Sequence, residues 1–100
     1  MKFLVIGDVV GRAGRLALQN NLSKIKDQFK IDFTIVNGEN SAGGYGITGK
    51  IYEEMMNWGV DAVTLGNHAW KKDEIIPYME SNPNHNICLL YTSDAADDLG

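Results

Sequence analysis

Cysteine and histidine are scarce in this 100-residue chain, and negative charges outnumber positive ones. The single cysteine, Cys88, excludes an internal disulfide, and no apolar run reaches the ~20 residues that a membrane-spanning helix needs. The start of the chain lacks the basic region, long apolar stretch and cleavage site of a signal peptide, so we expect a cytoplasmic protein with no membrane partner. The formal net charge of −4 argues against a general nucleic-acid surface.

Apolar residues, in contrast, are plentiful enough for a globular core. Hydrophobic residues make up 44% of the chain and aromatic residues 9%, which is too much for a disordered protein. A chain of 100 residues is one domain at most.

Three short apolar runs, at residues 2–6, 32–36 and 60–65, are typical of buried parallel strands. Residues 85–87 are a candidate for the start of a fourth strand. Because each connection is long enough to contain a helix, the strands should run parallel with right-handed crossovers. The sequence therefore predicts an α/β fold with three parallel strands, a candidate fourth strand and crossover helices.

Helices are expected in the connections between these runs. The first should span about residues 12–29, where one apolar stripe recurs at helical spacing: Leu18, Leu22, Ile25 and Phe29. A second helix should begin after Thr48, whose hydroxyl can cap it, and should end at Gly59. Pro77 predicts that a third helix, near residues 74–80, is short or kinked.

Each of the three predicted strands is followed by residues suited to metal or acid–base chemistry. Residues 7–8 are Gly-Asp, residues 37–40 are Asn-Gly-Glu-Asn and residues 66–68 are Gly-Asn-His. The carboxyl ends of parallel strands meet at the edge where α/β proteins bind ligands. Carboxylate and amide oxygens with some histidine suit manganese, iron or zinc, and two such ions about 3.5–4 Å apart can clamp a phosphoryl group. His68, with an ordinary pKa near ~6.5, could protonate a leaving oxygen at neutral pH.

Four blocks of sequence resemble the calcineurin-like metallophosphoesterase superfamily, and most closely its YmdB-type branch of bacterial 2′,3′-cyclic-nucleotide phosphodiesterases. They are Gly-Asp-Val-Val-Gly-Arg at 7–12, Val-Asn-Gly-Glu-Asn at 36–40, Gly-Gly-Tyr-Gly-Ile-Thr at 43–48 and Leu-Gly-Asn-His at 65–68. The resemblance extends from residue 1 to about residue 87. It implies a phosphodiester or cyclic-nucleotide substrate and two iron, manganese or zinc ions that hold the attacking hydroxide.

The resemblance also implies roles for individual residues. The implied metal ligands are Asp8, Glu39, Asn40 and Asn67. Glu39 would bridge both metals, and His68 would donate a proton to the departing ribose oxygen. Val10 stands where the superfamily usually has a histidine, and the family takes further histidine ligands from strands beyond this chain. We therefore expect residues 1–87 to hold about half of a site and the isolated chain to have little turnover.

Simpler interpretations of the same residues stay open. Asp8 could cap a helix, Glu39 and Asn40 could be turn residues, and residues 67–68 could be an Asx turn with a partly buried histidine. An alternative function is a Rossmann-like nucleotide-binding module without hydrolysis, because glycines at 7, 11 and 14 loosely imitate its fingerprint. Their spacing differs from that fingerprint, however, and Asp8 would repel a pyrophosphate unless a metal intervened.

The last thirteen residues differ in character from the rest. Residues 88–97 resemble the translation of a transposase sequencing adapter. We therefore expect residues 1–87 to be the N-terminal part of a metallophosphoesterase domain and residues 88–100 to be a non-native tail. In the full family the sheet is one half of an αββα sandwich, so this truncated half should leave one apolar face open.

Overall fold

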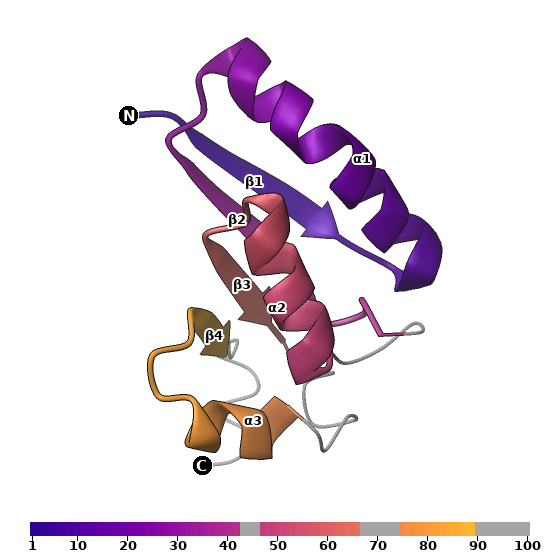
Figure 1. The fold of residues 1–100 in the computed structure, drawn as a ribbon, viewed down its shortest axis with the longest axis vertical. Coiled ribbons are helices and arrows are strands. Elements are labelled where there is room, and N and C mark those ends of the chain that lie inside the picture. Colours follow the sequence, from indigo (N-terminus) through magenta and orange to yellow (C-terminus); the bar gives the residue numbers. More distant parts are fainter. Residues whose placement is uncertain (43–46, 67–74, 90–100) are drawn as a thin grey trace, which may run out of the picture.

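The computed structural model describes residues 1–42, 47–66 and 75–89. It shows alternating strands and helices in chain order: β1 (Phe3–Asp8), α1 (Gly11–Phe29), β2 (Phe33–Asn37), α2 (Gly49–Trp58), β3 (Ala62–Leu65), α3 (Ile75–Ser81) and β4 (Ile87–Leu89). All four strands are parallel and form one sheet in the order β1-β2-β3-β4 (Figure 1). The predicted α/β fold with parallel strands is confirmed, and the candidate fourth strand is present.

The helix ends follow the capping chemistry expected from the sequence. Thr48 Oγ1 accepts a hydrogen bond from the Ile51 backbone N–H at 3.1 Å, which caps the start of α2. Gly59 ends α2 with φ of 109°, a left-handed conformation that costs glycine little. Pro77 is the third residue of α3, where its missing N–H would have no partner inside the helix, so α3 forms with the proline in its first turn.

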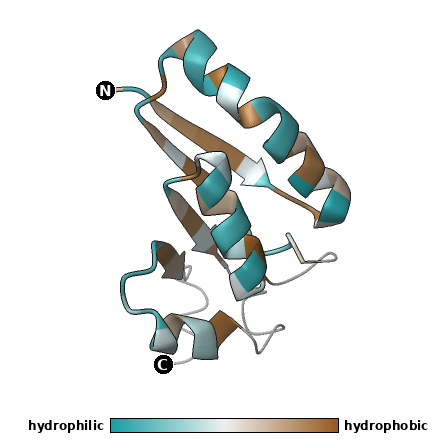
Figure 2. Ribbon diagram, viewed as in Figure 1, coloured by the Kyte–Doolittle hydropathy of each residue, from teal (hydrophilic) through white to brown (hydrophobic). Residues whose placement is uncertain are grey.

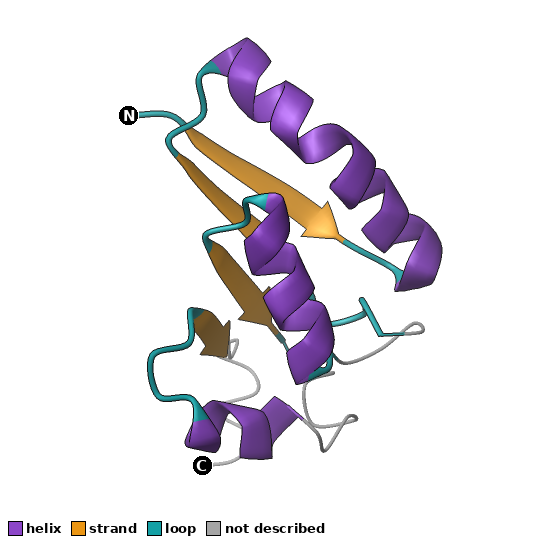
Figure 3. Cartoon of the chain, in the orientation of Figure 1, coloured by secondary structure: helices purple, strands orange, loops and turns teal. Residues whose placement is uncertain are grey.

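Helices α1 and α2 cover one face of the sheet (Figure 3), and the buried residues of the strands and helices form one hydrophobic core. Alternate strand residues point into it, and Val36, Val63 and Leu65 are all fully buried. From the helix layer, α1 contributes Leu18 and Leu22, α2 contributes Ile51 and Met55, and α3 contributes Ile75. Phe29 was expected to continue the stripe of α1 but is 52% exposed, because it lies in the last turn, just before the chain reverses at Lys30.

The other face of the sheet is open at β1, as expected for one half of a sandwich. Phe3 is 59% exposed and Val5 is 70% exposed, although parallel strands are ordinarily covered on both faces. Hydrophobic residues run along β1 (Figure 2), and the Phe3 ring packs edge-on against Phe33 with centroids 6.0 Å apart. Exposed apolar surface of this kind favours association with another molecule.

Two further observations concern membrane-spanning helices and the predicted tail. No helix among residues 1–42, 47–66 and 75–89 is long and apolar enough to cross a membrane. Strand β4 continues to Leu89, two residues past the boundary predicted for the tail. That boundary stays a prediction.

Candidate metal centre at the carboxyl edge of the sheet

The segments that leave β1, β2 and β3 are tied together by backbone hydrogen bonds. The bonds run from Val9 N to Asn37 O at 3.3 Å, from Gly11 N to Asn40 O at 3.1 Å and from Gly38 N to Thr64 O at 3.0 Å. The loop after β2 thus lies between the other two strand exits and contacts both. Two of the three predicted site segments therefore meet at one edge, and β3 leads to the third.

A bulge at the end of β1 positions Asp8. Residues of β1 and β2 pair in register up to Ile6 and Val36, but Asp8 then pairs with Asn37, so Gly7 is an extra residue in β1. Bulges bend a strand and redirect the next side chain. Here the redirected side chain reaches the β2 loop: Asn40 Nδ2 donates to both carboxylate oxygens of Asp8, at 2.9 and 3.0 Å. The two residues expected to share one metal are in direct contact.

Glu39 is oriented by Asn37, the last residue of β2. The Glu39 backbone N–H donates to Asn37 Oδ1 at 3.1 Å, and Asn37 Nδ2 donates to Glu39 Oε1 at 3.5 Å. Asn37 was not among the predicted site residues. The pattern Asn-Gly-Glu could have indicated an Asx turn that orients a carboxylate, because asparagine at a strand exit often bonds the backbone two residues on.

The carboxylate of Glu39 lies against Gly66, at the exit of β3. A Cβ atom placed on Gly66 would be 2.5 Å from Glu39 Oε2 and 3.1 Å from its Cδ. No side chain fits between Glu39 and the backbone at this point, so glycine is required for this arrangement. The Glu39 carboxylate therefore lies between the exit of β2 and the exit of β3, beside the residue that precedes Asn67.

The β2 loop itself is fixed by packing underneath the site. A Cβ atom on Gly38 would be 2.9 Å from Val63 Cγ1 and 3.2 Å from Ile47 Cδ1. The fully buried Ser41 donates its hydroxyl proton to the Gly38 carbonyl at 2.7 Å. The loop that carries Glu39 and Asn40 therefore rests on the core and is not a free surface turn.

The oxygen-rich donor set suits a hard divalent cation. Asp8 and Glu39 offer carboxylate oxygens, and Asn40 offers a carbonyl oxygen. In the structure the Asn40 amide nitrogen faces Asp8. Since an amide binds metal through its oxygen, a cation beside Asp8 would require the Asn40 amide to turn over. Within the part of the chain that the structure describes, no three or more His, Cys, Asp or Glu residues gather as a metal-binding group.

The remaining predicted site residues, Asn67 and His68, lie outside the described residues. Their roles stay predictions. The other histidine, His85, belongs to a different place: its Nδ1 accepts a hydrogen bond from the Ile87 backbone N–H at 3.0 Å, at the amino end of β4. His85 thus lies at the amino end of the parallel strands, whereas Asp8 lies at their carboxyl end.

Comparison with known proteins gives matches over most of the chain. A family model described as YmdB-like protein matches residues 4–88. Over 84 residues, the chain is 48% identical to a 2′,3′-cyclic-nucleotide 2′-phosphodiesterase of Bacillus subtilis (strain 168), which covers 84% of this chain and 32% of the relative. A hypothetical protein of Thermus thermophilus superposes with a TM-score of 0.79 at 37% identity, over 89% of this chain and 33% of that one. A novel phosphatase of Mycoplasma pneumoniae has the same TM-score at 35% identity, over 89% of this chain and 31% of that one.

The chain spans about a third of the length of each of these three proteins. The family match nevertheless includes every residue discussed at the carboxyl edge, from Asp8 to the Gly-Asn-His segment at 66–68. On this match, together with the parallel α/β sheet and its clustered strand exits, the chain belongs to the YmdB-like protein family.

Proposed function

We propose that this chain carries part of the active site of a dinuclear, metal-dependent phosphodiesterase that hydrolyses 2′,3′-cyclic nucleotides. The observation that carries the proposal is the meeting of Asp8, Asn40 and Glu39 at one edge, with Glu39 pressed against Gly66. The relative from Bacillus subtilis, a 2′,3′-cyclic-nucleotide 2′-phosphodiesterase, supports the choice of substrate.

The proposed roles are those that the family resemblance implies. Asp8 and Asn40 would hold one iron, manganese or zinc ion, Glu39 would be shared by two ions, and Asn67 would hold the second. Such an ion pair, when bound, supplies an activated water and neutralises charge on the phosphoryl group. His68 donates the proton that the departing ribose oxygen needs.

The alternative, a Rossmann-like nucleotide-binding module, is less well supported by the geometry. In such a module the pyrophosphate lies against the amino end of the first helix. Here Asp8 and Asn40 lie beside the start of α1, where Gly11 bonds the Asn40 carbonyl. A carboxylate in that position favours a cation over a bare phosphate. Metal-free binding of NAD by the chain would favour the alternative.

A chimera tests the proposed function directly. Residues 4–88 would replace the matched segment of the Bacillus subtilis phosphodiesterase, which supplies the remaining two thirds of a related protein. We expect the chimera to hydrolyse 2′,3′-cyclic AMP in the presence of Mn²⁺ and to lose this activity with a chelator. A chimera that is folded by circular dichroism, contains metal and is inactive would contradict the proposal. The isolated 100-residue chain is expected to show little turnover.

The Gly66→Ala substitution in the same chimera tests the position of Glu39. The added Cβ would overlap the end of a flexible side chain, so Glu39 should move while the core stays intact. We expect activity to fall roughly 100-fold, as when the arrangement around a metal ligand is disturbed. The unfolding midpoint in urea should change little. Unchanged activity would show that Glu39 does not need to lie against Gly66.

A further inference from the structure

A groove between α1 and α2 carries a concentration of positive charge that the proposed chemistry does not use. It has a volume of about 460 Å³, which is in the range of small-ligand sites. Arg12 and Arg15 of α1 and Lys50 of α2 line it, so it holds three of the nine Lys and Arg residues of an acidic protein.

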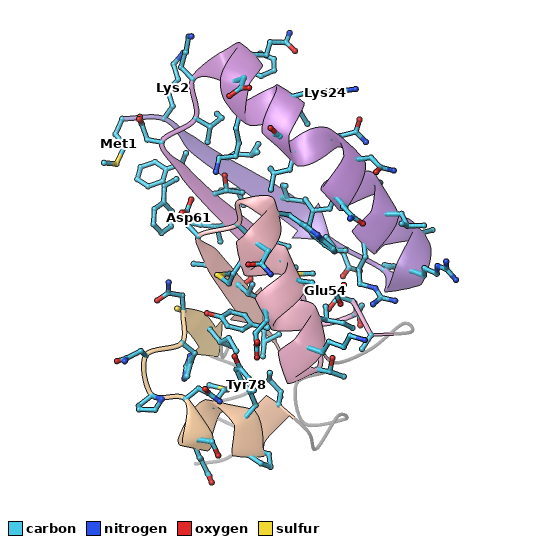
Figure 4. The ribbon with its side chains drawn as sticks, in the orientation of Figure 1. Met1, Lys2, Lys24, Glu54, Asp61 and Tyr78 are labelled. Carbon is cyan, nitrogen blue, oxygen red and sulfur yellow. The ribbon has the colours of Figure 1, made fainter. Side chains whose placement is uncertain are left out.

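The groove also contains an aromatic and an acidic side chain. Trp58, half-buried in the last turn of α2, lines the end of the groove away from Lys50. Glu54 lies on the side of α2 that faces α1 (Figure 4) and leaves the lining with a net charge of +2. From Lys50 to Trp58 the helix advances roughly 12 Å. A basic groove with an aromatic ring is the arrangement that binds single-stranded nucleic acid, because phosphates pair with the cations and a base stacks on the ring.

The groove begins next to the candidate metal centre. Gly11, which precedes Arg12, donates its backbone N–H to the Asn40 carbonyl, and Asn40 contacts Asp8. Arg15 is held near the same end by its Nε, which donates to the Gly11 carbonyl at 3.4 Å. A ligand that extends from the metal centre along the helices would therefore meet Arg12 and Arg15 first.

The covalent structure of the proposed substrate determines which part of it could enter the groove. A 2′,3′-cyclic phosphate occupies both the 2′ and 3′ oxygens of its ribose, so any further nucleotide must be attached through the 5′ oxygen. We propose that the groove binds the nucleotide on the 5′ side of the cyclic phosphate, and that the enzyme acts on oligoribonucleotides ending in a 2′,3′-cyclic phosphate in preference to free cyclic mononucleotides. This inference rests on the proposed function and deepens it. A local basic groove is consistent with a chain of net charge −4, because the groove has to bind only the end of one RNA strand and not a duplex.

Binding to the 100-residue chain tests the inference without requiring activity. The probe is a 5′-fluorescein tetraribonucleotide with a terminal 2′,3′-cyclic phosphate, followed by fluorescence anisotropy with Mn²⁺ at several salt concentrations. We expect Arg15→Gln and Lys50→Gln each to weaken binding about 3- to 10-fold and to reduce the slope of log K against log salt by about 0.7. Lys24→Gln, on an exposed position of α1 outside the groove (Figure 4), removes the same charge and should leave binding unchanged.

The outcomes separate the groove from the proposed function. The proposed groove would be wrong if wild type, Arg15→Gln and Lys50→Gln bound the probe equally. It would also be wrong if Lys24→Gln weakened binding as much as the two groove variants do. Tight binding of unlabelled 2′,3′-cyclic AMP, equal to that of the tetranucleotide, would also contradict the preference for oligonucleotides. If a tetranucleotide ending in a 3′-hydroxyl binds as well as the cyclic one and still depends on Arg15, the groove is supported, while the proposed function fails only if the folded, metal-containing chimera is inactive. The two variants lie on different helices, and circular dichroism of each variant would check that it is folded.

Discussion

Glu39→Gln in the chimera is expected to lower kcat for 2′,3′-cyclic AMP by on the order of 10³-fold and to remove one of two bound metal ions. Glutamine keeps the size of the side chain and an oxygen that can accept from Asn37 Nδ2, so the loop should keep its shape. What it removes is the negative charge that two cations would share. Steady-state kinetics and metal content by mass spectrometry measure the two effects.

Glu80→Gln is the matched control, since Glu80 is exposed on α3 and its substitution removes an equal charge. It should leave both kcat and metal content unchanged. If Glu39→Gln retained two metal ions and full activity, Glu39 would not be a shared ligand, and its contact with Gly66 would be a packing feature alone.

Gly49→Ala is expected to destabilise the chain by about 2 kcal/mol, although alanine ordinarily favours a helix over glycine. Gly49 is the first residue of α2, and a Cβ there would overlap the ring of Tyr78 on α3, including its Cγ at 2.9 Å. That ring cannot move freely, because it packs edge-on against Tyr52 with centroids 5.8 Å apart. The pKa of Tyr78 is raised above its ordinary value by burial and by its hydrogen bond to Glu53.

Urea unfolding followed by circular dichroism measures this cost. Gly7→Ala provides the control, since a Cβ on Gly7 meets nothing within 4 Å. Combining Gly49→Ala with Tyr78→Leu should recover part of the loss, because the smaller side chain leaves room for the methyl group. A Gly49→Ala chain as stable as the wild type would show that α3 shifts away from α2 at little cost.

The fold could be predicted from the sequence because its signals are local. A hydroxyl at Thr48, a glycine at position 59 and three apolar runs each depend on a few neighbouring residues, and the structure places all of them as expected. The parallel pairing followed from the length of the connections. Phe29 continues the apolar stripe of α1 by its spacing, but spacing does not show that it lies in the last turn, just before the chain reverses at Lys30, where its side chain is exposed.

The details of the site depend on contacts between segments far apart in the chain, and these could not be predicted. The bulge at Gly7 appears only when β1 is paired with β2. The contact of Glu39 with Gly66 depends on the twist and register of β2 and β3, and the role of Asn37 depends on the rotamers of two side chains. The sequence indicated which residues reach the edge, whereas their mutual orientation required the structure. The assignments of Asn67 and His68 stay predictions.

The strand order β1-β2-β3-β4 has a consequence for how the chain forms as it is synthesised. Every strand after the first pairs with the strand made just before it, separated by one crossover. Within residues 1–42, 47–66 and 75–89, each strand after β1 finds its partner already made, so each new strand–helix unit can dock onto the sheet already present. Each pairing still requires one whole crossover to close, which is slower than forming a local turn or hairpin. Asp8 and Asn40 can therefore meet once β2 and its loop have left the ribosome, whereas Glu39 reaches its place against Gly66 only after β3 has been made.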